Sequence, residues 1–120
     1  MGLDTYASNS PHAVELTAEQ AEAFEKASTR LCGGILSGGG ASFRGKVYHS
    51  LILTVTGESL YQAWIPPETV QRMSRALTAC DPREAIEASD GQVTSVQEVL
   101  ALQRFFEVCA DHGLGLHGWW

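Results

Sequence analysis

Apolar side chains recur at helical spacing in several stretches of the chain, with polar side chains between them. The first stretch runs from about Ala18 to Leu31 and has Phe24 on its apolar side. Thr17 and Gln20 form a capping-box pattern at its start, in which each side chain accepts a hydrogen bond from the other's backbone. We therefore predict a helix here that packs one side against a core.

Three further helices are predicted in the second half of the chain. Two begin at the prolines of Pro66-Pro67-Glu68 and Asp81-Pro82, because proline fits the first helical turn. The longest runs from about Ser95 to His112 and is ended by Gly113. Its apolar residues cover a wide arc, so we expect it to be the central and most buried helix.

The segment from Phe43 to Thr56 fits both helix and strand periodicity. Its β-branched residues near the end favour a strand, whereas its length and the terminating Gly57 favour a helix. We favour the helix. A helix would place its N-terminal amides next to the preceding glycine-rich loop, which is a suitable arrangement for binding an anion.

The two ends of the sequence, 2–7 and 114–120, are short, punctuated by glycine and extended in character. The second ends in two tryptophans, whose rings favour an interface over open water. We predict that the ends pair as neighbouring strands or lie side by side across the helices. The predicted fold class is α+β: a helix-rich single domain of residues 1–120, with about four helices and a small sheet involving the N- and C-terminal segments, to which Gly34–Ser37 is a candidate addition.

The composition is that of an acidic globular protein, with 120 residues, 44% hydrophobic content and a net charge of -6. This negative charge disfavours binding to nucleic acid and to anionic lipid. The sequence has no signal-peptide pattern and no apolar run long enough to cross a membrane. The three cysteines, Cys32, Cys80 and Cys109, are odd in number and widely spaced, which indicates free thiols rather than disulfides. Because free thiols are typical of a reducing compartment, we predict a cytoplasmic protein. The oligomeric state stays open.

The first candidate site is the glycine-rich loop Gly38–Lys46, which is followed by His49. Loop amides and two cations together suit a phosphate or a carboxylate. The predicted ligand-binding residues are Gly40, Ser42, Arg44, Lys46 and His49. The alternative is a solvated turn whose cations balance nearby glutamates. The partial G-x-x-x-x-G-K pattern ending at Lys46 does not predict nucleotide hydrolysis, because Val47 stands where a Mg²⁺-binding hydroxyl is required.

The second candidate site is aromatic and consists of Tyr61, Trp64 and Trp119. Tyrosine and tryptophan supply much of the binding energy in protein interfaces, so these residues are predicted to bind a partner. The alternative is that their rings cover the core.

The sequence predicts no metal, no cofactor and no catalytic residue. Cys109, His112 and His117 have spacing that suits part of a zinc site, but a fourth ligand has no evident source. No cysteine or serine stands in a recognisable nucleophile motif with a base.

The opening Met-Gly-Leu-Asp-Thr-Tyr and the terminal His-Gly-Trp-Trp resemble the ends of a group of small, uncharacterised bacterial and phage proteins that begin Met-Gly-Leu-Asp. The resemblance covers only the two ends. It implies a bacterial or phage source and carries no activity.

Two functions are compatible with the sequence. The favoured one is a small acidic, non-enzymatic binding or inhibitor module that acts on a protein partner. A phage-borne inhibitor of a host enzyme or defence protein is one form of this hypothesis. The alternative is a small-ligand-binding protein or enzyme that holds an anionic group at Gly38–Lys46.

Overall fold

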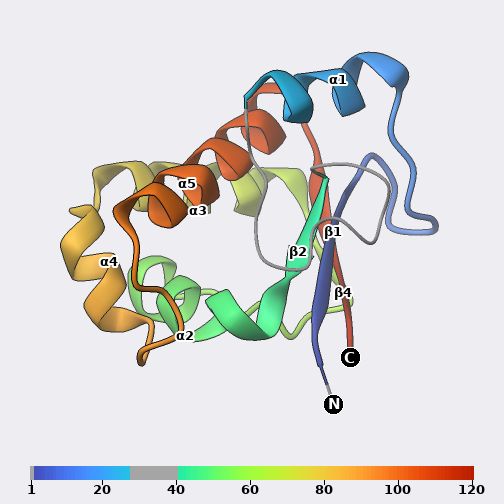
Figure 1. The fold of residues 1–120 in the computed structure, drawn as a ribbon. Helices are drawn as coiled ribbons and strands as arrows, with labels where there is room; N and C mark the ends of the chain where they lie inside the picture. Colours follow the sequence, from blue (N-terminus) through green and yellow to red (C-terminus); the bar gives the residue numbers. More distant parts are fainter. Residues whose placement is uncertain (1, 28–40) are drawn as a thin grey trace.

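Strands from the two ends of the sequence lie side by side in a four-stranded antiparallel sheet of order β2-β1-β4-β3 (Figure 1). The computed structural model describes residues 2–27 and 41–120. Within these ranges the elements are β1 (Asp4–Ser8), α1 (Ala18–Lys26), β2 (Ser42–Arg44), α2 (Gly45–Thr56), β3 (Trp64–Ile65), α3 (Pro67–Ala79), α4 (Pro82–Ala88), α5 (Val96–Asp111) and β4 (Gly115–Trp119). The predicted α+β fold class, with a sheet built from the terminal segments, is confirmed.

The two terminal strands pair over their full lengths. β1 and β4 are antiparallel, with Asp4 opposite Trp119 and Ser8 opposite Gly115. The N- and C-termini therefore lie next to each other at one end of the sheet (Figure 1). The prediction that the ends pair as neighbouring strands is confirmed. β2 and β3 add the two edges, and β3 is only two residues long.

The start of α1 follows the predicted capping box. Thr17 Oγ1 accepts a hydrogen bond from the Gln20 amide at 3.1 Å, and Gln20 Oε1 accepts one from the Thr17 amide at 2.9 Å. α1 is described as far as Lys26, with Ala27 as its cap. The rest of the helix predicted to Leu31, and the candidate strand Gly34–Ser37, lie outside the described residues.

The ambiguous segment is a helix, α2, from Gly45 to Thr56, and Gly57 ends it with a left-handed φ of 78°. Phe43, however, was expected on the helix and belongs to β2, where it lies opposite Thr5 of β1. The described part of the candidate loop Gly38–Lys46 therefore contains the three-residue strand β2, and Gly45 and Lys46 belong to the first turn of α2. The described residues contain five helices. Four of them are the helices predicted without ambiguity, and α2 is the fifth.

Phe43 connects the sheet to the helices. Its ring lies 5.0 Å from Phe105 of α5 and 5.5 Å from Tyr48 of α2, measured between ring centroids, and both contacts are edge-to-face. Phe105 in turn packs on Phe24 of α1 at 4.9 Å. All four rings are fully buried. Such edge-to-face pairs add stability beyond the apolar area that they bury.

α5 is the most buried of the described helices, as predicted. It packs against α1, α3 and α4. Its buried residues are Val99, Ala101, Leu102, Phe105, Phe106, Val108 and Cys109, more than any other described helix contributes. Within 2–27 and 41–120, no helix combines the length and the apolar character needed to cross a membrane.

The close passage of β4 along the segment before β3 makes Gly118 intolerant of a side chain. A Cβ at Gly118 would lie 2.4 Å from the Gln62 carbonyl oxygen and 2.8 Å from that of Leu60. Both are backbone atoms and cannot rotate away. We predict that Gly118→Ala lowers the free energy of unfolding by about 1–3 kcal/mol, measured by urea denaturation. Gly2→Ala is the control, because its Cβ would meet only the Arg44 side chain at 3.4 Å. Equal stability of the two variants would contradict the close packing at Gly118.

Candidate functional site

The residues predicted to bind an anion occupy different environments. Gly40 lies outside the described residues. Ser42 is buried, Lys46 is exposed and His49 is half-buried. Arg44 Nε lies 3.0 Å from Asp4 Oδ1, and both side chains are about half exposed. Arg44 therefore already forms an ion pair with a carboxylate of the neighbouring strand.

The start of α2 is packed against the N-terminal segment. The Lys46 amide donates to the Leu3 carbonyl oxygen at 3.3 Å. A Cβ on Gly45 would lie 2.5 Å from Thr5 Oγ1 and 2.8 Å from the Leu3 side chain. The Lys46 amide is thus already hydrogen-bonded within the protein, and the side chains of Leu3 and Thr5 fill the space beside Gly45. Binding of an anion at Ser42, Arg44, Lys46 and His49 stays a prediction.

Three large aromatic side chains are exposed at the end of the sheet where the termini meet. The exposed fractions are 63% for Trp119, 56% for Trp120 and 36% for Tyr61. We call these three residues the C-terminal aromatic surface. Trp64, the other predicted partner-binding residue, is half-buried rather than exposed. It belongs to β3, and its ring centroid lies 4.9 Å from that of His117 on the neighbouring strand β4. Trp120 was not among the predicted site residues, although its position beside Trp119 in the sequence was a usable signal.

Ring contacts extend the C-terminal aromatic surface on both sides. Tyr61 lies edge-to-face against Trp120 at 5.7 Å and against His49 at 4.7 Å, measured between ring centroids. Trp119 lies edge-to-face against Tyr6 at 6.2 Å. Gly118, Trp119 and Trp120 line an open depression of about 400 Å³. The ring contacts therefore form two groups, Tyr6 with Trp119 and His49 with Tyr61 and Trp120, and the depression lies where Trp119 and Trp120 adjoin.

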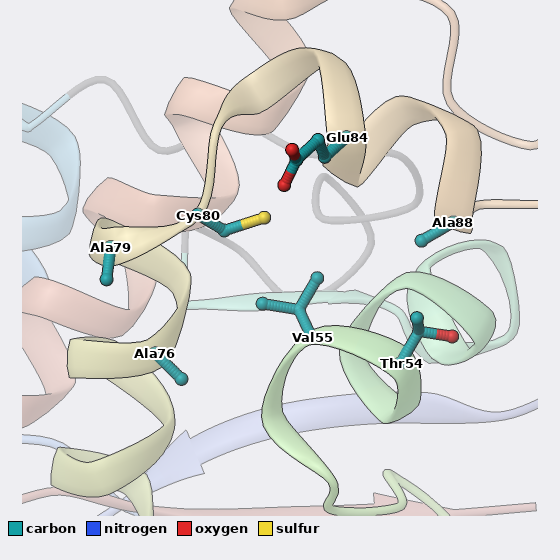
Figure 2. A pocket seen from close by; sticks show the side chains of 7 residues that line it. All are labelled: Thr54, Val55, Ala76, Ala79, Cys80, Glu84 and Ala88. Carbon is teal, nitrogen blue, oxygen red and sulfur yellow. The ribbon is translucent and has the colours of Figure 1, made fainter.

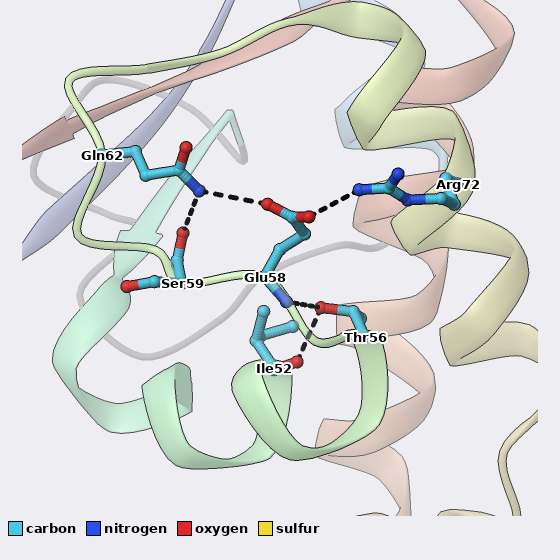
Figure 3. A network of polar contacts seen from close by, with 6 residues as sticks. All are labelled: Ile52, Thr56, Glu58, Ser59, Gln62 and Arg72. Carbon is cyan, nitrogen blue, oxygen red and sulfur yellow. Dashed lines mark hydrogen bonds and ion pairs between the residues drawn. The ribbon is translucent and has the colours of Figure 1, made fainter.

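The loop that carries Tyr61 is held by a polar network centred on Glu58 (Figure 3). Glu58 accepts hydrogen bonds from Arg72 of α3 at 2.5 Å and from Gln62 Nε2 at 3.4 Å. Gln62 Nε2 also donates to the Ser59 carbonyl oxygen at 2.7 Å. The Glu58 amide donates to Thr56 Oγ1 at 3.1 Å, which ties the loop to the last turn of α2. The loop that carries Tyr61 is thus held in place by contacts to α2 and α3.

The structure brings parts of the two predicted sites to the same end of the molecule. Asp4 lies opposite Arg44 on one side and opposite Trp119 on the other. Residues directly opposite each other in antiparallel strands share one face of the sheet. His49, predicted for the anion site, contacts Tyr61 of the aromatic surface. The ion pair and the exposed rings are therefore neighbours.

His49 Nδ1 is buried and has no hydrogen-bond partner among the described residues, and the same is true of Thr5 Oγ1. An imidazole nitrogen left in this state can still accept or donate a hydrogen bond. The His49 ring itself lies against Tyr61, with 4.7 Å between the ring centroids.

Two of the three residues with zinc-like spacing have structural roles. Cys109 is fully buried in α5, and desolvation by burial strongly raises the pKa of its thiol, so it stays protonated. His117 Nε2 lies 2.7 Å from the Ser10 carbonyl oxygen, which holds the segment after β1. In the part of the chain that the structure describes, no group of three histidine, cysteine or acidic residues is placed to hold a metal ion.

Comparison with protein-family models, with curated proteins and with solved structures finds no match to this chain.

The Asp4–Arg44 pair allows a direct test of the anion hypothesis. We predict that inorganic phosphate raises the melting temperature of Asp4→Asn by a few degrees more than that of the unsubstituted protein, because the substitution releases Arg44 and removes a repelling charge. Arg44→Ala should abolish the phosphate effect. Arg72→Ala is the control, since Arg72 pairs with Glu58 instead. If phosphate stabilises Arg44→Ala as much as the others, or stabilises none of them, the anion site is wrong.

Proposed function

We propose that this protein is a non-enzymatic binding module that contacts a protein partner through the C-terminal aromatic surface. One observation carries the proposal: Trp119 and Trp120 are 63% and 56% exposed on neighbouring positions. Large apolar groups that are exposed together are a feature of interaction sites, and tryptophan and tyrosine are enriched among the residues that dominate binding energy.

The supports of this surface favour binding with little reorganisation. Trp119 is the last residue of β4, which pairs with β1 along its whole length. Tyr61 is on the loop held by Glu58, Arg72 and Gln62 (Figure 3). Rings that are already positioned lose less conformational entropy when a partner covers them, so more of the contact energy contributes to affinity.

The chemistry of the chain supports a partner with a basic surface. A net charge of -6 attracts cationic proteins over long range and speeds their encounter. The exposed rings of Trp119 and Trp120 suit arginine and lysine side chains, because a cation is attracted to the electron-rich face of an indole ring. Charge would thus guide association, and the rings would supply the short-range contact. An inhibitor would act by covering such a basic surface on its target.

The cytoplasmic location is part of the proposal. Among the described residues, Cys80 and Cys109 are free thiols. Free cysteines in a small protein suit a reducing compartment, where disulfides are rare.

Site-specific photo-crosslinking in bacterial cells tests the proposal. A benzophenone amino acid at Trp119, and separately at Tyr61, should crosslink the same protein, and that protein should have a basic surface. The same probe at Glu22, on the exposed side of α1, should not crosslink it. Crosslinking of the same protein from Glu22, or of a second copy of this chain from Trp119, would contradict the proposal.

Binding of the purified partner gives the quantitative test. We predict that Trp119→Ala and Trp120→Ala each raise the Kd by about thirtyfold or more, the effect of losing an interface residue that contributes about 2 kcal/mol. The matched control is Leu53→Ala, which removes an apolar side chain of 44% exposure from α2. The affinity should fall as salt concentration rises. Unchanged affinity in both tryptophan variants would sink the proposal.

A further inference from the structure

A second concave site lies away from the aromatic surface, between three helices. A pocket of about 340 Å³ is lined by Thr54, Val55, Ala76, Ala79, Cys80, Glu84 and Ala88 (Figure 2). Thr54 and Val55 belong to the end of α2, and Ala76 and Ala79 belong to α3. Glu84 and Ala88 belong to α4. Its volume falls within the range of about 300–1,000 Å³ typical of small-molecule sites.

The pocket exists because small side chains line it on two of its three helices. Ala76 and Ala79 on α3, and Ala88 on α4, leave space that longer side chains would fill. Together with Val55 they make four of the seven lining residues apolar. Figure 2 shows the methyl groups of Val55 between the alanines of α3 and the residues of α4. This part of the pocket suits a short aliphatic or aromatic group.

The polar part of the pocket is acidic. Of the described residues that line it, Glu84 alone carries a charge. Figure 2 shows its carboxylate directed toward the Cys80 side of the pocket. Burial raises the pKa of the Cys80 thiol, and the nearby carboxylates of Glu84 and Asp81 raise it further, so the thiol stays neutral. A negative charge beside an apolar lining complements a cation with an apolar body.

We infer that the pocket between α2, α3 and α4 binds a small organic ammonium ion, with its apolar body against Val55 and the alanines and its cationic group on the Glu84 carboxylate. An anion would be repelled by Glu84, and a neutral molecule of the same shape would lack the charge-assisted hydrogen bond. This site is separate from the C-terminal aromatic surface and does not depend on it.

The test uses three probes of equal length: n-hexylammonium, n-hexanol and hexanoate. Binding is followed by ¹⁵N–¹H NMR shifts of the pocket amides, such as those of Ala76, Cys80 and Ala88. We expect n-hexylammonium to shift these amides in a saturable way at millimolar concentration. n-Hexanol should bind about tenfold more weakly, and hexanoate should not bind.

Two substitutions on the same helix separate the Glu84 interaction from general charge effects. Glu84→Gln should weaken n-hexylammonium binding about tenfold. Glu87→Gln removes an exposed carboxylate that does not line the pocket, and it should leave binding unchanged. Both residues are exposed, so both variants should fold. Ala76→Leu should fill the pocket and block binding.

Three outcomes would overturn the inference: no saturable shift at the pocket amides, equal affinity for n-hexanol, or equal loss of affinity in Glu84→Gln and Glu87→Gln.

Discussion

The antiparallel pairing of β1 with β4 is the contact on which the rest of the structure depends. These strands come from opposite ends of the sequence, and together they form the centre of the sheet, with β2 and β3 attached at the edges. β2 places Phe43 against Phe105 of α5, which joins the sheet to the helical layer. A pairing between residues so far apart in sequence closes nearly the whole chain into one loop, and this costs conformational entropy that the buried rings must offset.

The same pairing builds the proposed contact surface. Asp4 at the start of β1 lies opposite Trp119 at the end of β4, so the Asp4–Arg44 ion pair and the exposed rings meet at one end. The loop before β3 then adds Tyr61, whose ring contacts both Trp120 and His49. Residues from four separate parts of the chain thus converge there. The ammonium-binding pocket forms independently, where α2, α3 and α4 meet and alanines leave space.

Local patterns in the sequence predicted local structure well. The capping box at Thr17, the prolines that begin α3 and α4, and the glycine after α5 all mark real helix boundaries. Phe43 was misplaced because its role depends on pairing with Thr5, and helical periodicity cannot report a partner so distant in sequence. The greater exposure of Trp120 than of Trp64 could not be predicted either, because exposure depends on tertiary packing. The α2–α3–α4 pocket left no motif, because it is formed by small residues on different helices.

Hydrogen exchange at β4 tests the central role of the terminal pairing most directly. Leu116 and His117 lie between β1 and β3, so both neighbours cover their backbone groups. The account predicts that their amide hydrogens exchange only through global unfolding, with the same free energy of opening as the amides of Phe105 and Phe106 in α5. Exchange at Leu116 and His117 with a free energy several kcal/mol lower than in α5 would show that the sheet opens while the helical core stays folded. That result would contradict the account.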